Sequence, residues 1–300
     1  MTHRPVLLQE VLAGLAPEPG EIFLDATINR GGHARAIAER LGPRGRLIGL
    51  DRDREALAEA AVTLATGPSS VKLVESNFAD LATVLDQLGG PRIDLALFDL
   101  GFSSEQMDES RRGFSFRRDE PLYMTFGAPA ALAPGALTAA AIVNTWPEAA
   151  LVKIFREYGE EKFAGPIARA IVAARGREHL VGTGQLVKVI ESAVPAGYRH
   201  RRLHFATKTF QALRIAVNDE LGSLERALPA VWSRLALGGR LGVISFHSLE
   251  ARLVKNFFRN LVKEGQGELV TPRAVKPSPA EVKRNPRARS AQLRIIKKIS

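Results

Sequence analysis

Short apolar runs alternate with helical patterns through the first hundred residues of the chain. Four runs with the length and composition of β-strands begin at Ile22, Leu47, Val71 and Ile93. Helical periodicity follows the first three of them, over residues 34–41, 54–64 and 79–88. Strands that alternate with helices pack as a parallel sheet covered on both faces. The pattern therefore predicts an α/β fold with a doubly wound parallel sheet.

The alternation stops after the fourth strand. Helical patterns without intervening strands follow at residues 136–144, 147–158, 162–175 and 184–193. Such a run of helices inside an α/β chain indicates an inserted helical domain. We therefore predict that residues 1–104 and 205–300 form the sheet domain and that residues 105–204 form the insertion.

The sheet pattern resumes near the end of the chain. It predicts a long helix over residues 208–235 that breaks near Pro229, because proline disrupts a helix interior. A fifth strand over 241–247, a helix over 249–262 and a last strand over 293–299 follow. Residues 265–280 contain three prolines and predict a mobile segment without regular structure.

Residues that could bind a ligand stand where each of the first four predicted strands ends. Gly31 and Gly32 open the helix after the first strand, Asp51 ends the second, Asn77 and Phe78 follow the third, and Asp99 ends the fourth. Ligands of doubly wound sheets bind beyond the carboxyl ends of the strands, where an acid after the second strand can accept hydrogen bonds from ribose hydroxyls. This arrangement predicts a nucleotide-like cofactor.

Charge is concentrated at the end of the chain. The net charge is +10, and residues 276–300 carry +7 of it, with eight lysines and arginines against the single acid Glu281. A cluster of this kind favours a polyanion, because neutralised phosphates release counterions. A nucleic acid is therefore the expected partner, and a merely solvated basic surface is the alternative.

Composition excludes several kinds of chemistry. The chain has no cysteine, so it has no disulfide, thiolate zinc site or cysteine nucleophile. Its six histidines show no paired zinc-binding spacing, and we expect no metal site. Neither a signal-peptide pattern nor an apolar run of membrane-spanning length is present. These features lead us to expect a soluble, cytoplasmic protein.

Several unusual strings occur in one order along nearly the whole chain. They are Arg30–His33 (RGGH), Asp51–Asp53 (DRD), Asp99–Ser104 (DLGFSS), Arg112–Phe116 (RGFSF), Tyr158–Glu161 (YGEE), Thr209–Ile215 (TFQALRI), Ser245–Glu250 (SFHSLE) and Asn285–Ser290 (NPRARS). In these strings the chain resembles the MraW or RsmH type of bacterial methyltransferase. That family uses S-adenosylmethionine to methylate the N4 amine of a cytosine in 16S (small-subunit) ribosomal RNA, near the decoding region.

The resemblance implies a Rossmann-like class I methyltransferase sheet with an inserted helical domain, and it assigns roles to particular residues. S-adenosylmethionine would contact these residues: Gly31, Gly32, His33, Asp51, Phe78, Asp99 and Gln106. Methyl transfer to an amine needs alignment and a proton acceptor rather than a metal. Asp99 is the first candidate acceptor, and Ser103 and Ser104 are candidate polar groups near the target base.

The expected partner is small-subunit ribosomal RNA, alone or in the 30S subunit. The basic residues expected to hold its phosphates are Arg199, Arg201, Arg202, Lys208, Arg287 and Arg289. Either Phe114 or Phe116 could stack on a base, and core packing is an equally good interpretation of both. The oligomeric state is left open.

The chain departs from the family pattern at a few positions. Asn29 replaces a glycine of the first turn, and Tyr123, Thr125 and Gly127 replace two acids and an arginine. These changes keep open a non-catalytic RNA- or ribosome-binding protein with a methyltransferase fold. A dinucleotide-dependent oxidoreductase is a second alternative, although the Gly-x-Gly-x-x-Gly pattern is absent.

Overall fold

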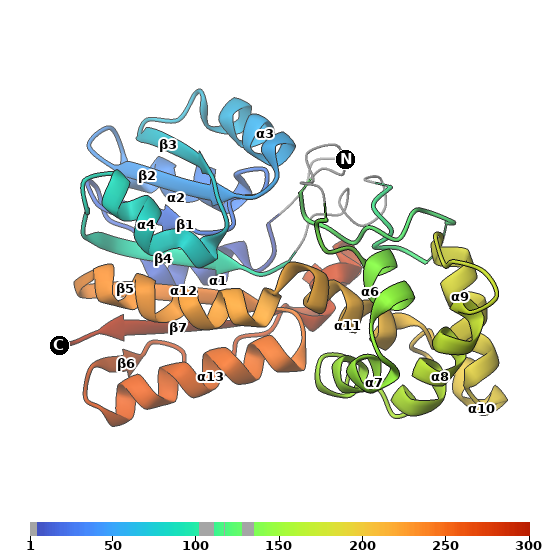
Figure 1. Cartoon of the computed structure of the whole chain (residues 1–300). Helices are drawn as coiled ribbons and strands as arrows, with labels where there is room; N and C mark the ends of the chain where they lie inside the picture. The colour runs from blue at the N-terminus through green and yellow to red at the C-terminus, as the bar shows by residue number, and fades with distance from the viewer. Residues whose placement is uncertain (1–4, 102–110, 117, 128–134) are drawn as a thin grey trace. The chain divides into compact units, whose positions relative to one another are not determined.

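The computed structural model describes residues 5–101, 111–116, 118–127 and 135–300. The chain divides into two compact units (Figure 1). The first comprises Met1–Gly101 and Leu221–Ser300, and the second comprises Phe102–Glu220. Among the described helices, none combines the length and apolar character needed to cross a membrane.

The first unit is built on a seven-stranded sheet with the order β3-β2-β1-β4-β5-β7-β6. The strands are β1 (Ile22–Asp25), β2 (Arg46–Asp51), β3 (Ser70–Glu75), β4 (Ile93–Asp99), β5 (Leu235–Ser245), β6 (Gly267–Leu269) and β7 (Gln292–Lys298). The first five run parallel, and β7 is antiparallel to both β5 and β6. The sheet fits the Rossmann-like class I methyltransferase fold that the resemblance implies, and the strand pattern of the sequence predicts six of its strands but misses β6.

Helices cover both faces of this sheet. One face packs against α1 (Leu8–Leu15), α2 (Gly32–Leu41) and α3 (Arg54–Leu64). The other packs against α4 (Leu81–Gln87), α12 (Glu220–Arg234) and α13 (Ser248–Lys263). The central strand β4 is apolar on both sides, and its residues Leu95 to Phe98 are almost fully buried. Such a strand requires helices on both faces.

The predicted helix over 208–235 is two helices, and the break is not at Pro229. The chain turns at Asp219, which has a left-handed φ of 48°, between α11 (Thr207–Asn218) and α12. Pro229 instead lies inside α12. A left-handed residue ends a helix by redirecting the backbone, and aspartate tolerates that conformation.

The prediction of a mobile segment over 265–280 is wrong. Strand β6 pairs with β7, Val275 forms a β-bridge with Leu293, and α14 (Pro279–Arg284) begins within the segment. The side chain of Ser278 accepts a hydrogen bond from the Glu281 N–H and caps α14. Prolines are compatible with this path because Pro279 occupies the first helical turn, where no backbone N–H is needed.

The second unit is helical. It contains α6 (Ala139–Thr145), α7 (Glu148–Glu157), α8 (Ala164–Arg175), α9 (Thr183–Ala193), α10 (Ala196–Arg199) and α11. Helix α11 belongs to this unit, which therefore continues to Glu220, past the boundary expected at residue 204. Two of the family-like strings meet here, because Gln211 on α11 donates a hydrogen bond to the Tyr158 carbonyl at 3.0 Å. This hydrogen bond joins α11 to the end of α7 and stabilises the helical unit.

Candidate active site at the sheet edge

The turn between β1 and α2 has a left-handed backbone at two positions. Asn29 has a φ of 49°, and Gly31 has a φ of 76°. Asparagine can occupy this region better than most residues, so its replacement of glycine preserves the turn. The Asn29 N–H donates to Asp51 Oδ2 at 2.9 Å, which ties the turn to the end of β2.

Helix α2 begins at Gly32, which packs against Pro5 of the N-terminal segment. A Cβ atom on Gly32 would lie 2.6 Å from Cγ of Pro5, so glycine is required for this close packing. His33 follows in the first helical turn and is only 6% exposed. Its Nε2 lies 2.9 Å from the Val6 carbonyl oxygen. Burial lowers the pKa of His33 to about 4, against smaller opposing effects of Val6 and Glu281, so the ring is neutral at pH 7.

The Asp51 carboxylate accepts hydrogen bonds from two neighbouring segments, the β1–α2 turn and the residues just before α3. Its Oδ2 accepts from the Asn29 N–H, and its Oδ1 accepts from the Asp53 N–H at 2.9 Å. Burial raises the pKa of Asp51, while these two backbone hydrogen bonds lower it. Each carboxylate oxygen has a second lone pair, so the group can still accept a ligand hydroxyl. Asp53, in contrast, caps α3 by accepting from the Glu55 N–H.

Asp99 ends β4 beside the same turn. Its backbone N–H donates to Thr27 Oγ1 at 2.7 Å, and its Oδ1 accepts from the Gly101 N–H at 3.2 Å. Its Oδ2 lies 3.6 Å from Nδ1 of His33. The structure therefore brings together His33 and Asp99, as predicted from sequence, and connects both to the glycine turn.

Asp25 is a site residue that the sequence analysis missed. It ends β1, is 2% exposed, and accepts one hydrogen bond at Oδ1 from the Thr27 N–H at 3.2 Å. Burial raises the pKa of Asp25 to about 8; the Thr27 hydrogen bond opposes this, and the negative charges of Asp99 and Asp51 add to it. An acid at the end of an apolar run was the available signal. Its burial could not be read from the sequence.

The raised pKa of Asp25 should make stability depend on pH. Between pH 4 and 8 the folded chain binds a proton at Asp25 that the unfolded chain has lost, so stability falls as pH rises through this window. One such proton corresponds to about 1.4 kcal/mol per pH unit. His33, with its lowered pKa, acts in the opposite direction only below about pH 6.5.

We therefore expect the melting temperature of the wild type to fall by several degrees between pH 6.5 and 8, and that of Asp25→Asn to fall much less. Asparagine keeps the shape of the protonated acid and cannot ionise. Thermal unfolding at several pH values without cofactor measures this difference. If the melting temperatures of both proteins changed equally with pH, Asp25 would be ionised in the folded chain.

Phe78 lies beyond the end of β3, in the short helix η1 (Phe78–Asp80). Its ring is half-buried and meets Phe98 edge-on, with ring centroids 5.7 Å apart. A partly exposed aromatic ring beside Asp51's strand is suited to contact with adenine. Three other predicted site residues, Ser103, Ser104 and Gln106, lie outside the residues that the structure describes.

Four of the predicted RNA-binding residues lie in the second unit. Arg199 donates to the Val194 carbonyl, and the Arg201 guanidinium lies 5.2 Å from the centre of the Tyr198 ring. Lys208 Nζ donates to the Glu160 carbonyl at 2.6 Å, which gives this lysine a structural role. Arg202 is exposed. Arg199 to Arg202 remain predicted phosphate contacts, and Lys208 is the weakest of the four.

The other predicted RNA-binding residues, Arg287 and Arg289, lie in the short helix η3 (Pro286–Ser290) of the first unit. Arg289 is exposed, as are Lys283 and Arg284 at the end of α14. Glu281, the acid of this segment, instead accepts a hydrogen bond from the Leu7 N–H at 2.8 Å. The segment of α14 and η3 therefore exposes positive charge and uses its acid internally, whereas Arg294 and Lys298 on β7 are partly buried.

The two phenylalanines considered for base stacking differ in environment. Phe114 is 6% exposed and packs in the core of the helical unit, so it cannot stack on a base. Phe116 is half-buried and stacks on His204, with ring centroids 4.3 Å apart. His204 also stacks on Phe205. Only Phe116 keeps the proposed stacking role.

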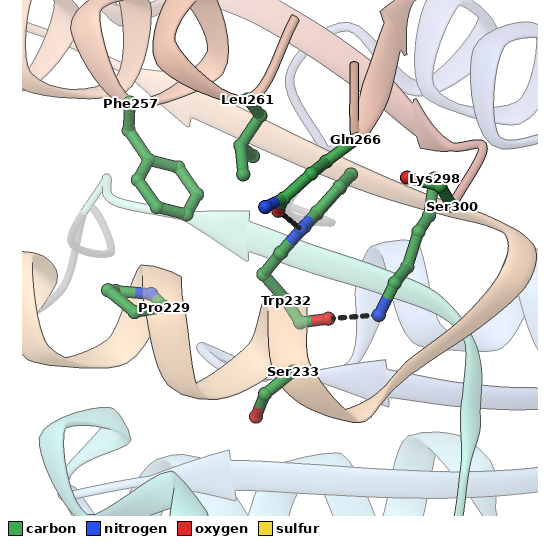
Figure 2. A pocket seen from close by; sticks show the side chains of 8 residues that line it. All are labelled: Pro229, Trp232, Ser233, Phe257, Leu261, Gln266, Lys298 and Ser300. Atoms are coloured by element: carbon green, nitrogen blue, oxygen red, sulfur yellow. Dashed lines mark hydrogen bonds between the residues drawn. The ribbon is translucent and has the colours of Figure 1, made fainter. Parts of the chain in front are cut away.

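A pocket of about 530 Å³ lies elsewhere in the first unit (Figure 2). It is lined by Pro229, Trp232, Ser233, Phe257, Leu261, Gln266, Lys298 and Ser300. Lys298 Nζ donates to the Trp232 carbonyl at 3.0 Å. Because β7 is antiparallel, Lys298 lies at the sheet edge opposite Asp99, so this pocket is separate from the candidate active site.

Comparison with known protein sequences identifies the family of this chain. The family model described as “MraW methylase family” matches residues 1–299. The chain is 46% identical to “Ribosomal RNA small subunit methyltransferase H” of Heliobacterium mobile, with 99% of each chain covered. It is 47% identical to the Symbiobacterium thermophilum protein of the same name, over 99% of this chain and 96% of that protein. Among solved structures, it is similar to an rRNA methylase from Streptococcus thermophilus, with a TM-score of 0.47, 12% identity and coverage of 100% and 99%.

Proposed function

We propose, from the premise that the chain belongs to the MraW methylase family, that it methylates the N4 amine of a cytosine in small-subunit ribosomal RNA. The observation that carries this proposal is the full-length similarity to relatives named for small-subunit ribosomal RNA methylation. The strand-end site supports it, because His33, Asp51 and Asp99 meet there in the first unit. The expected location is the cytoplasm, where ribosomes are assembled.

The residues present fit S-adenosylmethionine. Gly31 opens a turn with a φ that favours glycine, and the helix α2 that follows directs free N–H groups toward a carboxylate. Asp51 can accept from ribose hydroxyls, and Phe78 can contact adenine. Asp99 would supply negative charge for the methionine ammonium and the sulfonium, while Asp25, protonated below about pH 8, would offer a neutral carboxyl at the end of β1.

The chemistry requires little more than alignment and a proton acceptor. The N4 lone pair of cytosine is delocalised into the ring, so the amine is a weak nucleophile. S-adenosylmethionine carries the methyl group on a sulfonium, so the neutral sulfide that remains after transfer is a good leaving group. Asp99, fixed by Thr27 and Gly101, would accept the N4 proton as the new N–C bond forms.

The basic end of α14 should contribute to RNA binding. Replacing both Lys283 and Arg284 with alanine should weaken binding and reduce the slope of log K against log salt by about 1.4 to 1.8, because two phosphate contacts are lost. The measurement is a series of binding titrations with ribosomal RNA at increasing salt. Lys255→Ala with Arg259→Ala, which removes equal charge from exposed positions on α13, is the control. An unchanged slope would exclude α14 from the interface.

Incubation with labelled S-adenosylmethionine and unmethylated RNA tests the substrate class. Small subunits, large subunits and transfer RNA from cells lacking this methylation should be compared in parallel. We expect label only in small-subunit RNA. Cofactor binding without transfer to any RNA would instead support the non-catalytic binding protein, which the changes at Tyr123, Thr125 and Gly127 keep as the second candidate.

A further inference from the structure

The tautomer of His33 is fixed by its neighbours. The Val6 carbonyl oxygen, 2.9 Å from Nε2, can only accept a hydrogen bond, so Nε2 carries the ring proton. The other ring nitrogen, Nδ1, is therefore unprotonated in the neutral ring. It presents its lone pair on the side of the ring that faces Asp99.

Two proton acceptors thus face each other within the site. His33 Nδ1 and Asp99 Oδ2 are 3.6 Å apart, and their side chains are only 7% and 13% exposed. With Asp99 ionised there is no hydrogen to place between these atoms. A proton that Asp99 Oδ2 accepts would lie between the two atoms, bonded to Oδ2 and directed at the lone pair of His33 Nδ1.

An N-terminal strap, residues Pro5 to Leu7, holds this arrangement. Pro5 packs on Gly32, and Leu7 donates its N–H to Glu281 Oε1 at 2.8 Å while adopting a left-handed φ of 56°. These contacts place the Val6 carbonyl over His33. The strap therefore connects the start of α2 with the tail helix α14.

We propose that His33 is a positioning residue for the proton of the proposed methyl transfer, holding it jointly with Asp99. This rests on the proposed function. The N4–methyl bond forms, the methyl–sulfur bond breaks with its electron pair on sulfur, and the N4 proton passes to Asp99 Oδ2. Protonation of Asp99 would let the two atoms close from 3.6 Å to hydrogen-bond distance, with Asp99 Oδ2 donating to His33 Nδ1. Of the other titratable groups near the pair, Glu281 from α14 acts on His33, and Asp25 at the end of β1 interacts with Asp99 and with Asp51.

The decisive variant is His33→Asn, measured at saturating cofactor. We expect kcat to fall about tenfold, a smaller loss than that of a direct acceptor, while the cofactor Kd changes by less than about threefold. The acid limb of the kcat–pH profile should move to lower pH, because the protonated form of Asp99 is less stable without His33 Nδ1 beside it. His179→Asn, at an exposed histidine of the helical unit, should match the wild type.

Several outcomes separate the possibilities. An unchanged kcat and acid limb in His33→Asn would overturn the inference, as would a loss that appears only in the cofactor Kd. Absence of transfer by the wild type would instead overturn the proposed function. If the variant fails to fold, nitrogen NMR of histidine-labelled wild type decides: a proton on Nε2 with no titration near pH 6.5 supports the inference, and a proton on Nδ1 contradicts it.

Discussion

Replacing Asp99 with asparagine should reduce kcat for methyl transfer by about 10²- to 10⁴-fold, the range typical of a lost general base. Asparagine has nearly the same shape as aspartate, and its oxygen can still accept from the Gly101 N–H. The Thr27 contact uses the Asp99 backbone and is unaffected. The variant therefore loses the ability to take a proton while the end of β4 keeps its structure. Single-turnover rates with bound cofactor measure this step directly.

Asp94→Asn provides the matched control. Asp94 lies at the other end of the same strand, where its Oδ2 accepts from the Ile22 N–H at 2.8 Å. That variant should transfer methyl groups at nearly the wild-type rate. If Asp99→Asn also retained a rate within tenfold of the wild type, Asp99 would be a cofactor contact and another group would accept the proton.

The second large effect is expected for Asp51→Ala, which should raise the Kd for S-adenosylmethionine by about 5- to 150-fold. This corresponds to about 1–3 kcal/mol for the loss of a buried acceptor. Alanine would also release the Asn29 and Asp53 N–H groups, so the glycine turn would lose its anchor on β2. Isothermal titration calorimetry with cofactor alone measures the change.

Glu75→Ala is the control for this experiment. Glu75 pairs in register with Asp51 at the end of β3 and is exposed, so its removal changes the charge of the same sheet edge without touching the turn. We expect its Kd to stay close to that of the wild type. Equal cofactor affinity in Asp51→Ala and wild type would reject the ribose assignment.

The strand-end site could be predicted because strand ends are local features. The apolar runs ending at Asp51 and Asp99 carry strong period and composition signals, and parallel pairing brings such ends together. Asp25 ends a similar run, but its role depends on burial that the sequence does not show. The left-handed turn at Asn29 was also foreseeable from residue chemistry. The helix break was misplaced because Pro229 is a strong local signal, whereas the left-handed backbone at Asp219 is set by how its neighbours pack.

Long-range contacts account for what the sequence did not show. The hydrogen bond between Leu7 and Glu281 joins residues 274 positions apart, and no local sequence pattern predicts it. The order of residues 265–280 depends in the same way on pairing with β7. Likewise, no local pattern indicates that Lys208 donates a hydrogen bond to the Glu160 carbonyl.

The central claim is tested most directly by the identity of the methylated nucleoside. Small subunits from cells lacking this methylation would be incubated with the purified protein and labelled S-adenosylmethionine, and the RNA digested and separated by chromatography with mass detection. We predict that the label is recovered as N4-methylcytidine. Label in any other nucleoside, or none from a protein that binds the cofactor, would contradict the assignment.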